Sequence, residues 1–259
     1  MAATLPTNRF KRGLASGTRQ IGFWLNFASP TVTEVCAGAG FDWLLIDMEH
    51  SPNELPDVVH SLRACVGGTA EPVVRVPWNE PVMVKRLLDQ GARSFLFPFV
   101  QSAEEARRAV AATRYPPKGI RGFAGTTRAN HYARVTDYPK HAEDEICVLV
   151  QAETRKAVSE IEAVAKVEGI DGIFIGPADL AADMGHLADT QHAEVQAAIL
   201  DAGKRIRAHG KAPGFLSLRE DETRRVLEAG FLFVAIGTDV ALLARQTEAL
   251  LRSFKSGGA

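Results

Sequence analysis

The sequence contains little cysteine: only Cys36, Cys65 and Cys147 among 259 residues. Their number is odd and no pair has CxxC spacing, which argues against a disulfide framework and against a cysteine metal site. We expect all three to be small core residues of a protein in a reducing compartment, the cytoplasm.

Long apolar runs and a strong charge of one sign are also missing. No apolar stretch reaches the ~18 residues needed to span a bilayer, and the N-terminus lacks the apolar region of a signal peptide. A net charge of -1 gives no electrostatic reason to expect nucleic acid or a membrane as partner. The expected ligands are therefore small molecules.

Short apolar runs alternate with helical patterns along the chain. Eight runs predict strands, at residues 21–27, 43–48, 72–76, 94–99, 146–153, 172–176, 212–216 and 231–237. Apolar strands that alternate with helices are typical of a parallel sheet covered by helices. Eight units in 259 residues favour a single-domain (β/α)8 TIM barrel. An open doubly wound sheet is the alternative, because periodicity does not show closure.

Several helix boundaries have recognisable signals. Ser29 precedes a proline, and Ser102 and Ser217 each precede a glutamate by three residues, the spacing of a capping box. Residues 1–19 form an N-terminal lead-in, and the longest connection spans residues 115–145. Loops of this length in compact domains are usually functional lids or interface elements. We expect most of this connection to be a flexible surface loop.

Polar residues recur at the predicted strand ends, where the active sites of TIM barrels lie. Glu153 and Asp179 follow adjacent strands, so their carboxylates are expected to meet. Oxygen ligands suit a hard divalent ion such as Mg²⁺ or Mn²⁺. The alternative is a helix N-cap for Asp179 and a helix-start charge for Glu153. The full set of polar residues is Asp47, Glu49, His50, Arg75, Gln151, Glu153 and Asp179.

His50 and Arg75 are the candidate catalytic residues. His50 follows two carboxylates at the end of a buried strand, and a histidine titrates near neutrality, as a general base requires. Arg75 places a permanent charge inside a short apolar strand, which favours an anionic substrate or enolate as its partner. The alternatives are a loop histidine and a structural ion pair.

Long motifs then give a family resemblance. LLIDMEHSPN, PVVRVPWNEP, LLDQGAR, ATRYPPKGIRG, LVQAET and VEGIDGIFIGPADLAADMG together resemble the HpcH/HpaI family of metal-dependent pyruvate aldolases, over about residues 21–254. The resemblance implies that Glu153 and Asp179 are metal ligands, with Mg²⁺, Mn²⁺ or Co²⁺ as the cofactor. It also implies that His50 is the catalytic base and Arg75 the transition-state stabiliser.

Further roles also come from the resemblance. Asp89 matches an aspartate that raises the basicity of the histidine, and Gln151 and Ala178 match substrate-binding positions. We also place Trp24, Asp47 and Arg75 in the substrate-binding set. The family implies a homo-hexamer, a dimer of trimers, and apolar residues of the last helix suit such an interface, although they suit packing on the chain's own barrel equally well.

The implied activity is reversible cleavage of 4-hydroxy-2-oxo acids, such as 4-hydroxy-2-oxoheptane-1,7-dioate, to pyruvate and an aldehyde. The reaction would pass through a pyruvate enolate bound to the metal. Aldolases for 2-keto-3-deoxy sugar acids and acyl-CoA lyases share this barrel and are the first alternative. The second is a silent barrel that binds a keto acid without catalysis, which an intact set of base, arginine and carboxylates argues against.

Overall fold

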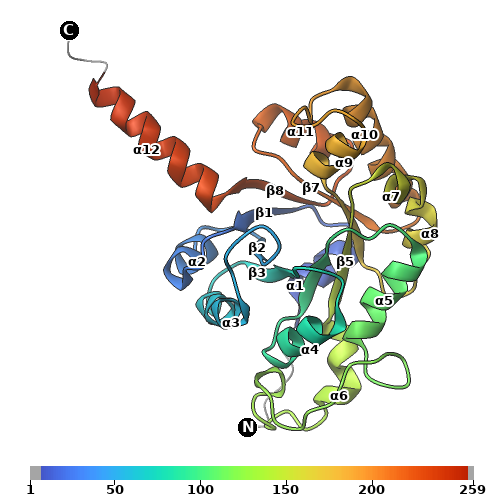
Figure 1. The fold of residues 1–259 in the computed structure, drawn as a ribbon. Coiled ribbons are helices and arrows are strands. Elements are labelled where there is room, and N and C mark those ends of the chain that lie inside the picture. Colours follow the sequence, from blue (N-terminus) through green and yellow to red (C-terminus); the bar gives the residue numbers. More distant parts are fainter. Residues whose placement is uncertain (1–6, 256–259) are drawn as a thin grey trace.

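Eight parallel strands form a closed barrel in which each strand pairs with the next and β8 pairs with β1 (Figure 1). The computed structural model describes residues 7–255. The strands are β1 (Gln20–Leu25), β2 (Trp43–Asp47), β3 (Glu71–Arg75), β4 (Ser94–Phe97), β5 (Cys147–Ala152), β6 (Gly172–Ile175), β7 (Ala212–Leu216) and β8 (Phe233–Thr238). The prediction of a (β/α)8 barrel is confirmed, and the open sheet is ruled out.

The predicted strand ends differ from the observed ends where the backbone changes direction. The predicted fourth strand extends to Phe99, but β4 ends at Phe97. Phe99 has φ 55°, a left-handed conformation that no strand residue adopts. A hydrophobic pattern does not report this turn, because Phe99 continues the apolar run.

Helices precede, connect and follow the strands. They are α1 (Arg9–Ala15), α2 (Pro30–Ala37), α3 (Leu55–Ala64), α4 (Pro81–Asp89), α5 (Ala103–Thr113), α6 (Tyr138–His141), α7 (Arg155–Ser159), α8 (Ile161–Ala165), α9 (Pro177–Asp183), α10 (Ala193–Ala208), α11 (Glu220–Glu228) and α12 (Asp239–Lys255). Two 3₁₀ turns, η1 (Arg128–Asn130) and η2 (Ala142–Glu145), lie in the long connection before β5.

The predicted caps are confirmed at two helices and wrong at a third. Ser29 and Ser102 accept backbone N–H groups in the first turns of α2 and α5. Ser217, however, does not cap α11, which begins at Glu220 after Arg219. The N–H of Ser217 still donates to the carbonyl of Ala235 on β8, so this residue continues the sheet ladder instead of starting a helix.

Aromatic side chains fill the inside of the barrel. Phe10 on α1 lies 5.6 Å from Trp43 and 5.8 Å from Phe233, measured between ring centroids. Phe10 and Leu14 are buried with the inward-facing strand residues, so α1 closes one end of the barrel. The predicted lead-in 1–19 thus contains a core helix, while its residues 1–6 lie outside the described residues.

The connection 115–145 is exposed over much of its length, but buried side chains anchor it. Val135 and Tyr138 are buried, and so is the side chain of Arg121. The Arg121 guanidinium lies 4.4 Å from the ring centroid of Tyr115 and donates to Asp89 at 3.2 Å. The expectation of a surface loop for most of this segment agrees with its exposure, and an arginine anchors the segment to α4.

The helices also bear on membrane association. Within residues 7–255, none of them combines the length and the apolar character that a membrane crossing requires.

Candidate active site

Asp47 and Arg75 form the buried centre of the candidate site. They end β2 and β3 and are direct partners in the strand register. Arg75 donates from Nε to Oδ1 of Asp47 at 2.8 Å and from Nη2 to Oδ2 at 2.7 Å. Both side chains are buried. The ion pair expected as the alternative for Arg75 is thus present, and it holds the guanidinium in a fixed plane.

Further donors surround the Asp47 carboxylate. It accepts hydrogen bonds from Trp24 Nε1 at 3.3 Å, Asn26 Nδ2 at 3.1 Å and the N–H of Glu49 at 3.0 Å. Burial alone would raise the pKa of Asp47, but the hydrogen bonds and charge of Arg75 outweigh burial, so its pKa is lowered. Asp47 is therefore an ionised group whose contacts orient other residues of the site.

Trp24, which the sequence analysis placed in the substrate-binding set, lies with its ring against the guanidinium of Arg75. The Arg75 guanidinium carbon lies 4.9 Å from the Trp24 ring centroid, a cation–π contact. Trp24 in turn lies 5.5 Å from Phe174, measured between ring centroids. The apolar interior of the barrel and the polar strand ends thus meet at this tryptophan.

Glu49 and Glu153 lie near Arg75, and the charge of Asp179 acts on both of these carboxyl groups. Burial raises the pKa of Glu153 to about 7, and the charges of Glu49 and Asp179 add to the increase. Burial likewise raises the pKa of Glu49 to about 7, with further increases from Asp47 and Asp179 and an opposing effect from Arg75. The charge of Asp179 thus acts on both Glu49 and Glu153, which is consistent with the prediction that Glu153 and Asp179 lie near each other.

The local backbone positions Glu153. Its Oε1 accepts the N–H of Phe99 at 2.7 Å, and its Oε2 accepts a short hydrogen bond from Gln151 Nε2. A Cβ at Gly176 would lie 2.5 Å from Oε2 of Glu153, so glycine is required there to leave room for the carboxylate. Asp179 lies in the first turn of α9, but the N-cap is Gly176, so the cap interpretation of Asp179 is wrong.

The residues present fit a divalent metal ion. Burial and neighbouring charges favour the protonated forms of Glu49 and Glu153, so a cation is needed for both to ionise fully at neutral pH. Two buried oxygens of the described chain, Glu49 Oε2 and Gln151 Oε1, also have no hydrogen-bond donor. The Nη1 of Arg75 lies 2.8 Å from Glu49 Oε2 but is not aligned for a hydrogen bond. A metal with its water ligands would satisfy such oxygens.

His50 and Asp89 do not meet within one chain. His50 is exposed directly after β2, at the end of the barrel that carries Arg75. Asp89 is the last residue of α4, which runs back to the other end of the barrel, and it pairs with Arg121. A His50–Asp89 pair therefore requires two chains. Ala178, the other predicted contact, is exposed in the first turn of α9.

Glu49 and Phe99 belong to the site, although the sequence-based assignment gave neither a role. Glu49 lies next to the assigned His50, and its position in a run of ionisable residues was the available signal. The role of Phe99 comes from its backbone, because its positive φ directs its N–H to Glu153. No side-chain pattern signals such a contribution.

A cavity of about 580 Å³ lies elsewhere, near the start of β3. Its lining includes Arg9, Glu71, Arg93 and Arg128. Glu71 begins β3, whereas Arg75 ends it, so this cavity belongs to the opposite end of the barrel.

A closed (β/α)8 barrel with clustered carboxylates, a clamped arginine and a histidine at its strand ends defines a class of protein: a barrel enzyme scaffold with an oxygen-rich site for a divalent metal. Residues 20–246 match the family described as HpcH/HpaI aldolase/citrate lyase, and the chain belongs to this family. The resemblance inferred from the motifs is confirmed.

Similar proteins agree with this assignment. A Klebsiella pneumoniae protein named 4-hydroxy-2-oxo-heptane-1,7-dioate aldolase is 55% identical over 95% of this chain and 94% of its own length. A solved HpcH/HpaI aldolase/citrate lyase family protein from Burkholderia cenocepacia is 40% identical, with a TM-score of 0.92 over 96% of this chain and 100% of its own. A solved HpcH/HpaI aldolase from Desulfitobacterium hafniense is 30% identical, with a TM-score of 0.86 over 95% and 96%.

Proposed function

We propose that this protein is a metal-dependent aldolase that reversibly cleaves 4-hydroxy-2-oxo acids, such as 4-hydroxy-2-oxoheptane-1,7-dioate, to pyruvate and an aldehyde. The observation that carries the proposal is that Glu49 and Glu153 lie near Arg75, which Asp47 holds in place, and that the charge of Asp179 acts on both carboxyl groups. Relatives named as aldolases at 54–55% identity over 95% of the chain support the substrate class.

Glu153 and Asp179 are the proposed metal ligands, with Glu49 close enough to act on the same ion or its water. When bound, Mg²⁺, Mn²⁺ or Co²⁺ supplies a Lewis acid that stabilises negative charge on a substrate oxygen. Which of these ions works in the cell is decided by their availability as much as by the oxygen ligands, which accept all three.

Arg75 is proposed to stabilise the charge that develops on the keto oxygen as the carbon–carbon bond breaks. Two of its nitrogens are fixed by Asp47, which leaves Nη1 on the side of the carboxylate cluster. A guanidinium held in place before the reaction loses no free energy to reorientation during it. Gln151 and the backbone at Ala178 are proposed to hold the substrate carboxylate, with Trp24 beneath it.

His50 is proposed as the base that removes the proton from the 4-hydroxyl group. Its exposed position leaves the ring accessible to a substrate lying over the strand ends. Asp89 would raise the basicity of His50 only from a neighbouring chain, because within one chain the two residues lie at opposite ends of the barrel.

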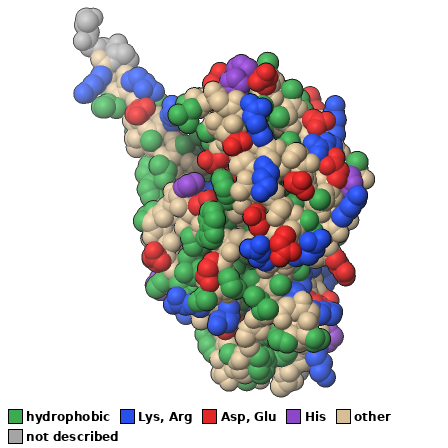
Figure 2. Space-filling view, turned by 45° about the vertical axis from the view of Figure 1, so that its right-hand side comes forward, with side chains coloured by type: hydrophobic (Ala, Val, Ile, Leu, Met, Phe, Trp, Pro, Cys, Tyr) green, Lys and Arg blue, Asp and Glu red, His purple; other side chains and the backbone are tan. Residues whose placement is uncertain are grey.

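We therefore also propose a homo-oligomer, a hexamer built from trimers. In support, α12 extends away from its own barrel (Figure 1), and Asp239 is the only one of its described residues to be buried. Figure 2 shows hydrophobic side chains along this extension. Leu242, Leu243 and Leu250 are each more than half exposed. The alternative that these leucines cover their own barrel is wrong, which leaves an apolar face for another chain. A monomeric mass in solution would contradict this proposal.

The cytoplasm is the proposed location. All three cysteines are free, with Cys65 and Cys147 buried and Cys36 half-buried, as expected for a protein in a reducing compartment.

The activity is tested by a kinetic panel. Purified protein with Mg²⁺, Mn²⁺ or Co²⁺ is given 4-hydroxy-2-oxo acids, 2-keto-3-deoxy sugar acids and acyl-CoA thioesters, and pyruvate or acetyl-CoA release is measured. The proposal expects the highest kcat/KM for the 4-hydroxy-2-oxo diacid and complete loss in chelator. Cleavage of only a sugar acid or a thioester would change the substrate class, and no cleavage at all would favour a binding protein.

A further inference from the structure

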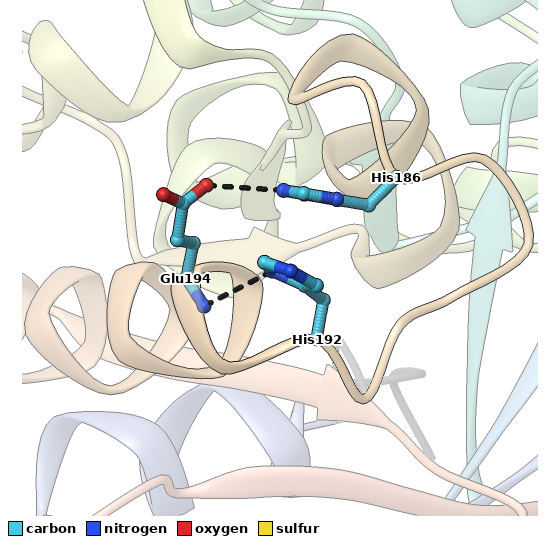
Figure 3. A group of neighbouring side chains, drawn as sticks. All are labelled: His186, His192 and Glu194. Atoms are coloured by element: carbon cyan, nitrogen blue, oxygen red, sulfur yellow. Dashed lines mark hydrogen bonds and ion pairs between the residues drawn. The ribbon is translucent and has the colours of Figure 1, made fainter.

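Two histidines and a glutamate lie together in the connection between α9 and α10, apart from the strand-end site. His186 follows the end of α9, His192 is the N-cap of α10, and Glu194 is in its first turn. The two imidazole rings overlap face to face, with centroids 3.4 Å apart (Figure 3). One donor atom from each residue lies within 4.8 Å of the other two.

The donor atoms face a common side. Nε2 of His186 lies 3.0 Å from Oε2 of Glu194, and Nδ1 of His192 accepts the N–H of Glu194 at 3.3 Å. Figure 3 shows these two nitrogens turned toward Glu194 from the same edge of the stacked rings. The arrangement places two nitrogens and one carboxylate around one small volume.

The backbone holds both histidines in place. The N–H of His186 donates to the carbonyl of Ala181 at 2.8 Å, and its carbonyl accepts the N–H of Asp189 at 2.9 Å. The N–H of His192 donates to the backbone carbonyl of Asp189 at 3.3 Å. Because the segment is already ordered and both rings are half-buried, a ligand that joins them would order little additional chain.

We propose that His186, His192 and Glu194 bind a divalent transition-metal ion of the Zn²⁺ class. Metal–nitrogen and metal–oxygen bonds of about 2.0–2.2 Å at tetrahedral angles place donor atoms about 3.3–3.5 Å apart. The 3.0 Å separation of His186 Nε2 and Glu194 Oε2 needs only a small widening for an ion to replace their hydrogen bond. His192 must rotate out of the stack, because imidazole lone pairs lie in the ring plane.

The simpler interpretation is a helix cap next to an exposed ion pair. That interpretation explains the contacts of His192 and of His186 separately, but it does not explain why both imidazoles and the carboxylate offer donor atoms within 4.8 Å of one another. The cap bond of 3.3 Å is also long, so His192 loses little by giving it up. Two imidazoles with one carboxylate are a common ligand set for zinc.

The proposed ion would join the end of α9 to the start of α10 and leave at least one coordination position for water. It would differ in kind from the ion at the strand ends, where oxygen ligands suit Mg²⁺ or Mn²⁺, because two imidazoles favour Zn²⁺, Co²⁺, Ni²⁺ or Cu²⁺. The chain would therefore bind a second ion when supplied with Zn²⁺ but not when supplied with Mg²⁺.

The experiment uses the full chain carrying Glu153→Gln, so that the strand-end site takes up little zinc. Zn²⁺ binding is measured by calorimetry at neutral to slightly basic pH in excess Mg²⁺. We expect one Zn²⁺ per chain. His186→Gln should weaken binding by at least about 10-fold, the lower limit for losing even an indirect metal contact. His192→Asn should do the same while keeping an N-cap acceptor.

His141→Gln is the matched control, since His141 lies 3.6 Å from one carboxylate and 4.0 Å from another without a second histidine. It should leave zinc binding unchanged. Cu²⁺ bound to the chain with native histidines should show hyperfine splitting from two nitrogens by electron paramagnetic resonance. No zinc binding in excess Mg²⁺, an affinity that both histidine substitutions leave unchanged, or a spectrum without two nitrogens would overturn the proposal.

Discussion

Asp47 and Arg75 are register partners on β2 and β3 and are joined by two parallel hydrogen bonds of 2.8 and 2.7 Å. Placing a guanidinium at a buried strand end is costly unless a carboxylate matches it. The pair therefore lets a permanent charge stay fixed at the mouth of an apolar barrel. The other proposed roles of the site depend on this arrangement.

Asp47→Ala should destabilise the protein strongly. It leaves the buried Arg75 without its main partner, and breaking a buried pair in this way costs about 3–5 kcal/mol. Asp221→Ala is the control, because Asp221 pairs with Arg219 at a similar 2.7 Å but both side chains are exposed. Its loss of stability should be much smaller, because water screens an exposed pair. The measurement is urea unfolding, and equal losses for the two variants would contradict the role given to burial.

Gly176→Ala should weaken metal binding without unfolding the barrel. The added Cβ would lie 2.5 Å from Oε2 and 2.9 Å from Cβ of Glu153, so the carboxylate must move. We expect about 10–100-fold weaker binding of Mn²⁺, the range for disturbing groups that orient metal ligands. Gly125→Ala is the control, because a Cβ there meets no atom within 4 Å. Calorimetric titration compares the two, and equal affinities would show that Glu153 does not bind the ion.

The metal should stabilise the protein more at high pH than at low pH. Burial raises the pKa of Glu49 and of Glu153 from 4.5 to about 7. A raised carboxyl pKa means that the metal-free fold loses stability as the pH rises from the ordinary value through about 7. A divalent ion favours the ionised carboxylates, so it restores this loss only where they ionise. Thermal unfolding with Mg²⁺ or chelator should show a larger Tm difference at pH 8 than at pH 5, whereas a constant difference would contradict a cation among these carboxylates.

Chains that carry His50→Ala and chains that carry Asp89→Asn should complement each other. If Asp89 acts on His50 of a neighbour, a mixed oligomer contains some sites with both native residues. Activity should rise when the two variants are unfolded together and refolded as a mixture, relative to each variant refolded alone. Should mixing give no gain, while both variants assemble normally, Asp89 does not act across chains.

The sequence predicted the barrel because each of its eight strands is a short, continuous apolar run. Such a run is visible in neighbouring residues of the sequence. The proposed ligand pair, Glu153 and Asp179, followed from the rule that the active sites of such barrels lie at the strand ends. Packing across the fold was not predictable in the same way. Arg121 lies in a segment that resembles a loop, and its burial is explained by the aromatic rings of Tyr115 and Tyr138 and by its ion pair with Asp89.

The sequence also did not indicate local backbone conformations or contacts with other chains. Phe99 contributes through a positive φ that its side chain does not signal. The stack of His186 and His192 depends on how one loop folds back, because the two residues are six positions apart in sequence. The apolar residues of α12 do not show in the sequence what the helix packs against. The same leucines would be buried by the chain's own barrel in one arrangement and by another chain in the other.

The central claim is that Arg75 and the carboxylate cluster together stabilise an enolate. Its most direct test is the exchange of the pyruvate methyl protons for deuterium, followed by nuclear magnetic resonance with Mg²⁺ present, because no aldehyde is needed. We predict rapid exchange by the native protein, none above background in chelator, and a rate lower by about 10²–10³-fold in Arg75→Ala, the usual cost of losing one such donor. Arg75→Lys should recover only part of the rate, since an ammonium group lacks the planar fork. Exchange that persists in chelator, or that Arg75→Ala leaves intact, would contradict the account.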